Sequence, residues 1–559
     1  MGDDILRAMP PTDPRPFSFL ALVALASACS RAEPELVAIE VKKTAPFDTS
    51  PAEVAEPAPP EDPVERLKGM MSKAEFDALQ GERGVRVNTS GATPGYTLVM
   101  PLNSTKIHLV DLDGKIAHTW ETGLAPGGWC YLLDDGTLLH AGRNDVDPKF
   151  KGGGIGGVIR RLAPDGSVLW RYDFANEAHC QHHDLEPLPN GNVLFIAWER
   201  KSRDEAIARG RHPDGVGAAG LWPDAVYEVR PTPPEGGEIV WEWHAWDHLI
   251  QDVDPAKPNY GKLADHPGRI DVNAAYEPEE SISDEKKKAQ EDRARQMAAL
   301  GYGGGAEIDA HDEPADSEPD VPPPPKPPKP PKWDTSGDWT HTNAVDHNVE
   351  LDLLVLSSPE LCEIFVIDHS TTTAEAATSR GGRFGHGGDL LWRWGNPERY
   401  GAGTEADRRL YYQHDPTWVP GAEPRILVFN NGGDRPGGDR SSVEELVPPF
   451  DAERGFLREP GRPFGPAAPA WTYASAGTFY SAFISGARRL ASGNTIVASG
   501  AAGRIFEVTP SGEIVWDYLN PLGGDLKPPE HAGKAPPLAL YRADRYAPDH
   551  PGIRQILGG

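Results

Sequence analysis

Residues 512–518 read GEIVWDY, and residues 237–243 read GEIVWEW. The same pattern, a short apolar run followed by two aromatic or histidine residues two positions apart, occurs in four further segments: GKIAHTW (114–120), GSVLWRY (166–172), GDLLWRW (388–394) and APAWTY (468–473). Residues two positions apart on a strand share a face, so each segment predicts a strand with an aromatic pair on one side. Repeats spaced by tens of residues indicate a solenoid, a propeller or another array.

The segments around these strands predict how each repeat is built. An apolar strand precedes each of them, as in KIHLVDLDG (106–114), and ends in a turn typical of a hairpin. A further strand follows an Asn-Gly or Asp-Gly turn, as in LPNGNVLFIA (188–197). Six sets of short antiparallel strands predict an all-β fold, a six-bladed β-propeller over residues 94–545. A sandwich or an open solenoid would also repeat, but long, unequal connections favour the propeller.

The composition excludes one class of partner. Lysine and arginine number 55 against 84 aspartates and glutamates, which gives a formal charge of −29. A surface that neutralises phosphates needs clustered lysine and arginine, so nucleic acid is not an expected partner. The 57 prolines and 60 glycines suit a β protein rich in turns.

The N-terminal region predicts export. Residues 17–28 (FSFLALVALASA) form an apolar run too short to span a bilayer, as in a signal peptide. The small residues before Cys29 resemble a bacterial lipobox, in which the cysteine is lipidated. We therefore expect a signal peptide over 1–29 and a periplasmic or outer-membrane-anchored protein, with the lipid as its membrane contact. The alternative is a mildly apolar, disordered leader.

The remaining segments outside the repeats are predicted as connections. Residues 30–66 read as a disordered tether, residues 67–93 as a short helical lead-in, and residues 546–559 as a C-terminal tail. A charged and proline-rich loop insertion occupies 280–332 and is interpreted as a solvated spacer in preference to an SH3-like ligand. The mature chain would hold an odd number of cysteines without a CxxC pair, which favours buried free thiols.

Three histidine motifs precede strands of different repeats: HCQHHD (179–184), DWTHTN (338–343) and YYQHDPTW (411–418). The inner strands of a propeller face its axis, so side chains from distant positions can converge there. A neutral imidazole is a nucleophile near pH 7, and other histidine and asparagine groups can bind anionic oxygens. The three motifs therefore predict transfer of an anionic group through a covalent histidine intermediate.

The residues resemble a known family, the bacterial arylsulfate sulfotransferases, over about 94–521. The resemblance rests on the blocks HHDLEPLPNGN, GDWTHTN, EIFVIDHSTTTAEA, LLWRWGNPERY, QHDPTW, ILVFNNG and GNTIVASGAAGRIFEV. It implies a six-bladed propeller that transfers a sulfuryl group from an aryl sulfate to a phenol without a phosphoadenosine donor. It also implies aryl sulfates and phenols as small-molecule partners, with no cofactor and no metal.

The resemblance assigns roles to four residues by motif. His414 would be the nucleophile that becomes sulfated, and His341 would hold or protonate the bridging oxygen. Asn343 would bind a sulfuryl oxygen, and His183 would bind another. His182 is the alternative to His183, although alternation along a strand would put His179, Gln181 and His183 on one face and turn His182 away.

Further positions are less firmly tied to the family pattern. Thr495, or Ser499, would supply a hydroxyl to the site. Family members usually carry an arginine that binds the sulfuryl group after the LS motif, but here Pro359 stands in its place. Arg435 or Arg440 would have to substitute for that arginine.

Two other functions remain as alternatives. The loss of the arginine at Pro359 favours a non-catalytic propeller that binds a ligand or partner. The histidine and cysteine donors of HCQHHD would suit a metal-binding protein, but no HExxH or CxxC motif supports it. Residues 152–157 match the dinucleotide fingerprint GxGxxG by letter only, because no strand precedes them and the segment that follows reads as a strand.

Overall fold

The structure is a computed structural model. It describes residues 71–78, 81–144, 150, 152–276, 337–421, 423–475, 479–526 and 538–558, all within one compact unit, 61–559. The predicted signal peptide with Cys29, the tether 30–66 and the insertion 280–332 lie outside these residues.

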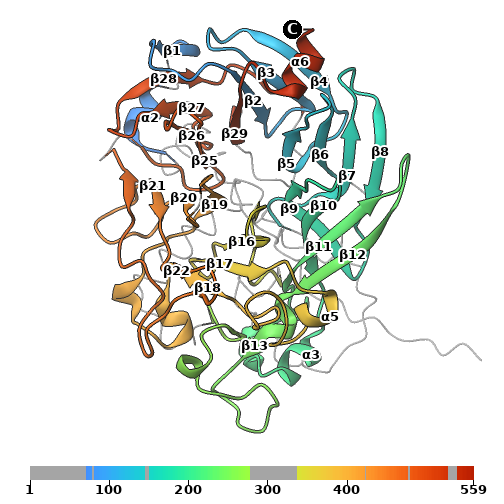
Figure 1. Ribbon diagram of the computed structural model, residues 1–559, viewed down its shortest axis with the longest axis vertical. Coiled ribbons are helices and arrows are strands. Elements are labelled where there is room, and N and C mark those ends of the chain that lie inside the picture. The colour runs from blue at the N-terminus through green and yellow to red at the C-terminus, as the bar shows by residue number, and fades with distance from the viewer. Residues whose placement is uncertain are drawn as a thin grey trace, which may run out of the picture. The chain divides into compact units, whose positions relative to one another are not determined.

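Six antiparallel sheets surround one axis as the blades of a β-propeller (Figure 1), which confirms the predicted fold. From the axis outward, blade 1 consists of β29 (Leu540–Tyr546), β2 (Tyr96–Pro101), β3 (Lys106–Val110) and β4 (Ile116–Glu121). In the same order, blade 2 consists of β5 (Pro126–Leu132), β6 (Leu138–Arg143), β7 (Gly157–Leu162) and β8 (Val168–Asp173). Blade 3 consists of β9 (His179–Pro187), β10 (Val193–Glu199), β11 (Asp224–Pro231) and β12 (Gly237–His244).

The other three blades follow the same order. Blade 4 consists of β15 (Ala344–Asn348), β16 (Leu353–Ser358), β17 (Glu363–Asp368) and β18 (Trp392–Trp394). Blade 5 consists of β19 (His414–Trp418), β20 (Ile426–Asn430), β21 (Ser442–Leu446) and β24 (Trp471–Tyr473). Blade 6 consists of β25 (Gly486–Arg489), β26 (Thr495–Ser499), β27 (Arg504–Val508), β28 (Ile514–Leu519) and, outermost, β1 (Gly84–Asn88).

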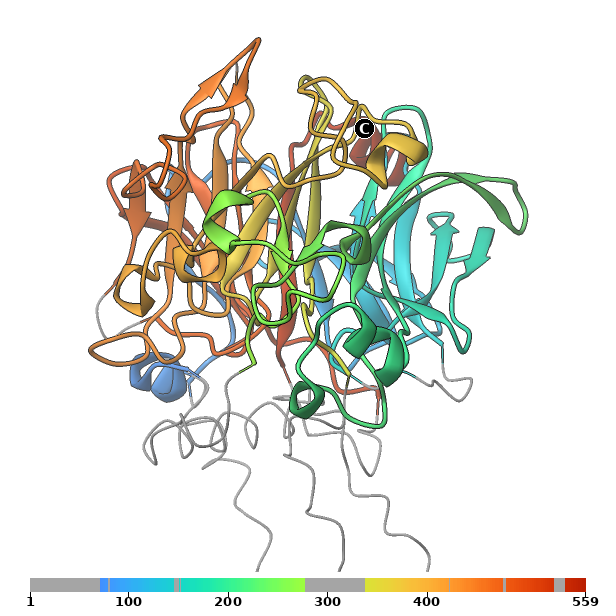
Figure 2. The ribbon, with the colours of Figure 1, turned by 90° about the horizontal axis from the view of Figure 1, so that it is seen from below.

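Helices and short strand pairs lie at the two ends of the blades (Figure 2). The helices are α2 (Lys73–Ala78), α3 (Arg203–Ala208), α5 (Thr373–Ala376) and α6 (Pro551–Leu557), and the short pairs are β13 (Leu249–Ile250) with β14 (Ile270–Asp271) and β22 (Phe450–Asp451) with β23 (Gly455–Phe456). Helix α2 and strand β1 both fall within the predicted helical lead-in, and α6 falls within the predicted tail. Among the described residues, no helix has the length and hydrophobicity of a membrane-spanning segment.

The six aromatic segments form the fourth strand of their blades, and they link each blade to the next. In five blades a tryptophan indole N–H donates to a backbone carbonyl just before the fourth strand of the following blade. These bonds are Trp170 to Gly236, Trp243 to Gly388, Trp392 to Gly465, Trp471 to Pro510 and Trp516 to Leu112, at 2.7 to 2.9 Å. In blade 1 His118 contacts the carbonyl of Pro164 at 2.9 Å instead. The repeat therefore encodes a ring of contacts between blades.

Closure of the ring joins distant parts of the chain. Strand β29 pairs with β2, so the first blade takes its innermost strand from the C-terminal region. Buried apolar side chains fill the spaces between neighbouring sheets, and Cys130, Cys180 and Cys362 are buried free thiols, as predicted. The inner strands of the six blades start at the same end of the axis. His341 and His414 lie just before or at the first residues of β15 and β19.

Candidate active site

Histidines from three blades meet where the inner strands begin. The imidazole rings of His183 and His341 are 4.5 Å apart between centroids and nearly perpendicular, at 76°. His414 begins β19 in the next blade, close enough that a positive charge on its ring would lower the pKa of His183. Three of the predicted site residues are therefore brought together from separate blades. Backbone φ is positive at His183 (53°) and His341 (48°), a region that non-glycine residues rarely adopt.

A bulge in β9 separates the roles of His182 and His183. The pairing of β9 with β10 shifts register between Phe195 and Ala197, so simple alternation along the strand does not hold there. His182 points into the blade, where its Nε2 is 2.9 Å from Asp224 and its ring stacks on Trp198 at 4.0 Å. Its Nδ1 is 2.7 Å from Nδ1 of His183. His182 therefore supports His183, which faces the other histidines.

His341 carries a positive charge. Its Nδ1 contacts the carboxylate of Asp338, which also accepts a hydrogen bond from the indole of Trp198 at 3.1 Å. Burial lowers the pKa of His341, but the charge and hydrogen bond of Asp338 outweigh it and raise the pKa to about 9. At neutral pH the site therefore contains an imidazolium, which is an acid and a positive charge.

His414 has the opposite character. Its Nδ1–H donates to Oδ1 of Asn431 at 2.8 Å and approaches the carbonyl of Tyr412 at 3.1 Å. The amide of Asn431 is fixed because its Nδ2 donates to the carbonyls of Ser481 and Ile484. Burial and the nearby positive charges lower the pKa of His414 to about 3, although the hydrogen bond to Asn431 raises it. None of the described residues hydrogen-bonds to its Nε2, so a neutral imidazole presents an unshared electron pair there.

Asn343 joins the same group from blade 4. Its Nδ2 donates to the carbonyl of Gln413 at 3.0 Å, which ties it to the residue preceding His414. Its Oδ1 has no hydrogen-bonding partner in the part of the chain that the structure describes. Asn343 is fully buried, so it holds blades 4 and 5 in register beside the nucleophile candidate.

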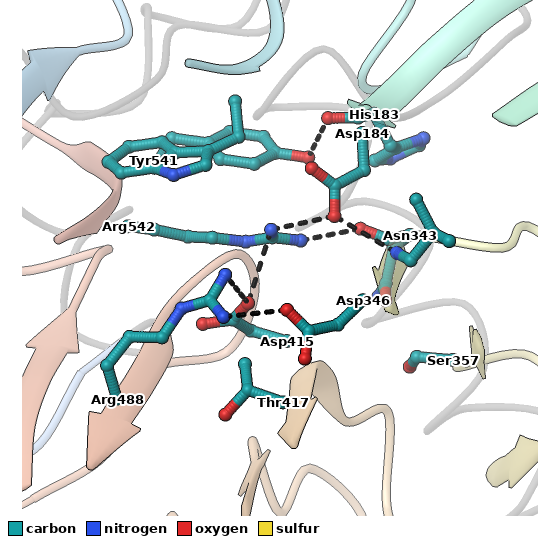
Figure 3. Close-up of polar contacts among 12 residues, drawn as sticks. His183, Asp184, Asn343, Asp346, Ser357, Asp415, Thr417, Arg488, Tyr541 and Arg542 are labelled. Carbon is teal, nitrogen blue, oxygen red and sulfur yellow. Dashed lines mark hydrogen bonds and ion pairs between the residues drawn. The ribbon is translucent and has the colours of Figure 1, made fainter. Parts of the chain in front are cut away.

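Ion pairs fill the axis next to the histidines (Figure 3). Arg542 of β29 lies between Asp184 and Asp415, at 2.8 and 3.2 Å, and donates to the backbone carbonyl of Asn343 at 2.8 Å. Arg488 of β25 pairs with Asp346 at 2.9 Å. Its Nε is 3.1 Å from Asp544.

Arg542 therefore links the inner strands of blades 1, 3 and 5. Its positive charge also lowers the pKa of His183 and of His414. Arg542 was not predicted from the sequence, because the strand that carries it lies outside the histidine blocks.

The sequence pattern of the arylsulfotransferase (ASST) family matches residues 154–446. This stretch is more than half of the 559 residues and contains His183, His341, Asn343 and His414. The chain belongs to the arylsulfotransferase family. Arg542 lies outside the matched stretch, so the family pattern alone does not define the whole site.

Solved structures add little to this arylsulfotransferase assignment. A protein of unknown function from Bacteroides caccae aligns with 81% of this chain and 98% of its own, at 10% identity and a TM-score of 0.35. The Pseudomonas aeruginosa periplasmic gluconolactonase PpgL aligns with 76% and 94%, at 13% identity and a TM-score of 0.35. Likeness at this level carries no argument about function. No curated protein matches the chain.

The glycine-rich segment 152–157 forms one wall of the arylsulfotransferase-family site. A Cβ on Gly154 would lie 2.3 to 2.5 Å from the imidazole of His183, and one on Gly156 would lie 2.1 Å from Gln181. The backbone N–H of His183 donates to the carbonyl of Gly154 at 2.7 Å. The glycines therefore allow close packing on His183. No role was predicted for them from the sequence once a dinucleotide site had been excluded.

Thr495 lies apart from this group, and Arg435 is engaged in contacts within blade 5. Thr495 pairs with Arg489 at the far end of β25, whereas the histidines lie at the end where the inner strands begin. Arg435 hydrogen-bonds to Ser442 at 3.0 Å and lies 3.6 Å from Glu444, within blade 5.

The other positions discussed from sequence have local roles. Ser499 donates to Glu75 of α2 at 2.7 Å. Pro359 is buried at the end of β16, and the positive charges near the histidines come from His341 and Arg542. Burial raises the pKa of the Cys180 thiol to about 12.

Proposed function

We propose that this protein transfers a sulfuryl group from an aryl sulfate to a phenol through a covalent intermediate on Nε2 of His414. The contrast between two imidazoles in one site carries the proposal. His414 is neutral, with no hydrogen bond to Nε2 from any described residue, whereas His341 is an imidazolium. The first suits a nucleophile, and the second suits a general acid.

The first half-reaction uses both groups. The electron pair of His414 Nε2 attacks the sulfur, and the bond between sulfur and the aryl oxygen breaks with its electrons moving to that oxygen. His341 donates a proton to the oxygen, so a neutral phenol leaves. In the second half-reaction an acceptor phenol attacks the sulfur, the N–S bond breaks, and the phenolic proton passes to His341. Both histidines then regain their starting state.

The electrostatics favour the first half-reaction. The transferred group keeps its negative charge throughout, and a positive group held in a buried site stabilises such charge. His341 is the positive group available for this role, because the positive charge of Arg542 is already paired with Asp184 and Asp415. We assign the binding of sulfuryl oxygens to Asn343 and His183, which lie in the same group as His414 and His341.

A second candidate is a propeller that binds an aryl sulfate without turning it over. The observation favouring it is Pro359, which stands where relatives usually carry an arginine. In this case the protein would be stabilised by the ligand but would release no phenol.

The test is incubation of the full-length protein with a chromogenic aryl sulfate, with and without an acceptor phenol. We expect phenol release and an intact-mass increase of one sulfuryl group, mapped to His414 by peptide analysis. The variant His414→Asn should lose both. The matched control is His179→Asn, a histidine of the HCQHHD block whose ring stacks on Phe174 instead of lying in the site. Thermal stabilisation by the aryl sulfate without release or adduct would support the second candidate.

A further inference from the structure

A second histidine cluster lies at the other end of blade 4, away from His414. His347 is near the end of β15, Asp352 lies in the turn between β15 and β16, and His369 follows β17. The Nε2 of His347 and the Nδ1 of His369 lie 2.9 and 2.7 Å from the same oxygen, Oδ1 of Asp352. The three potential ligand atoms all lie within 4.8 Å of one another. The cluster plays no part in the proposed sulfuryl transfer.

We propose that His347, Asp352 and His369 form a binding site for one divalent transition-metal ion of the zinc type. Two imidazole nitrogens and one carboxylate oxygen make a donor set that zinc prefers, and they leave a fourth position for water. Tetrahedral ligands about 2.0 Å from zinc lie roughly 3.3 Å apart, so each of the two distances to Asp352 would lengthen by about 0.5 Å. Its side chain is 45% exposed on a turn, whereas the two imidazoles are about nine-tenths buried.

The surroundings of His369 support this assignment. Its second ring nitrogen, Nε2, is 3.0 Å from Oε2 of Glu228 in the neighbouring blade. Asn190 and Asn192 donate to the other oxygen of that carboxylate. Histidine ligands of metals commonly donate their other N–H to a carboxylate, which fixes the ring and strengthens the ligand. Glu228 holds His369 in that way, with Nδ1 turned toward Asp352.

The charges of the cluster also suit a divalent cation. Asp352 and Glu228 are acidic, and the two nitrogens of His369 face their carboxylates. A divalent cation bound between the two histidines and Asp352 would therefore lie beside two negatively charged side chains. A bound ion would tie the β15–β16 turn to the end of β17 and, through Glu228, to blade 3.

Zinc binding to full-length protein made without a histidine tag tests the proposal. We expect one equivalent of Zn²⁺ in competition with a chromophoric chelator, a higher melting temperature with Zn²⁺, and the visible bands of a tetrahedral site with Co²⁺. His347→Gln and His369→Gln should each abolish this equivalent. Glu228→Gln should weaken the affinity about 10- to 100-fold, because it removes only the support of a ligand.

Controls separate this site from other histidines. His244→Gln removes an imidazole that also faces two carboxylates, Glu199 and Glu242, without a second imidazole, and it should retain the zinc. His414→Asn should retain it too. Because Asp352 lies on an exposed turn, Asp352→Asn should fold even if a variant of one of the buried histidines does not, and it tests the same site. Absence of a zinc equivalent, or an equivalent that survives Asp352→Asn and both ligand variants, would overturn the proposal and leave the cluster as an ion-pair network.

Discussion

The fourth strands of the blades and the innermost strands differ in how they use their side chains. On the outer strands, five blades repeat one contact, a tryptophan N–H donated to the next blade. On the inner strands, individual side chains such as His183, His414 and Arg542 make contacts that the described residues of the other blades do not repeat. A repeated contact is shared among many copies, whereas a unique one has no substitute. We therefore expect substitutions at unique contacts to have the larger effects.

Replacing Arg542 is expected to have the largest effect. Arg542→Met would leave Asp184 and Asp415 buried without their common partner and should cost about 3–5 kcal/mol of unfolding free energy. Arg542 lowers the pKa of both carboxyls, so its loss raises their folded values further above those of the unfolded chain. The destabilisation should therefore be smaller at pH 5 than at pH 8. Denaturant unfolding at the two pH values measures this, and equal losses at both would contradict the explanation.

Asn431 tests whether orientation of the nucleophile matters as much as its presence. Asn431→Ala removes the acceptor for Nδ1–H of His414 and should lower kcat roughly 100-fold with little change in KM, because the ring is no longer fixed. Steady-state kinetics with an aryl sulfate measures both constants. Asn430→Ala is the matched control: this neighbouring buried asparagine bonds to Tyr411, Arg409 and Glu444 but not to His414. An equal loss of kcat in both variants would mean that the effect is structural.

The effect of the positive charge on His341 can be tested without replacing its imidazole ring. Its folded pKa of about 9 predicts that activity falls as pH rises through 9, when the acid loses its proton. Asp338→Asn keeps the size of the side chain but removes the charge, so the alkaline limb should move toward the ordinary value near pH 6.5. At pH 8 this corresponds to a loss of about 30-fold. The pH profile of kcat measures this shift. If the alkaline limb of Asp338→Asn stays at the pH of the unsubstituted protein, His341 is not the acid.

The smallest expected effect comes from a repeated outer contact. Trp170→Phe deletes the hydrogen bond to Gly236 and part of a buried ring, and should cost about 1–2 kcal/mol of stability. Activity should be unchanged, because the other links keep the inner strands in place. Thermal unfolding and turnover of an aryl sulfate measure the two properties. A loss of activity without unfolding would break the distinction between outer and inner strands.

The same distinction explains what could be predicted from sequence. The fourth strands of the blades were recognisable because the same sequence pattern, an apolar run followed by an aromatic pair, occurs six times. The motifs of His183, His341 and His414 were recognisable because each precedes a strand of a different repeat, and the role of each residue follows from the resemblance to a family. Arg542 was missed because its neighbours in space, Asp184 and Asp415, are far from it in sequence, and nothing local marks the strand that closes the ring.

Other differences have local causes. The alternation used to separate His182 from His183 fails at the bulge, although His183 does face the other histidines. Thr495 begins β26, which runs antiparallel to the inner strand β25, so it lies at the end of the blade away from the histidines. The sequence motif alone does not indicate this, because it does not give the strand register. The packing of Gly154 on His183 is a tertiary contact that the glycine spacing does not indicate, and ILVFNNG contains Asn431 without indicating its partner.

The closing strand has a consequence for synthesis. β29 follows every other described strand in the chain, yet it supplies Arg542, the cation that unites three blades around the axis. A nascent chain that has completed the histidine blocks still lacks this residue and has two buried aspartates to accommodate. Activity therefore depends on synthesis of β29. A chain truncated before this strand would be inactive and unstable, so proteases would recognise it easily.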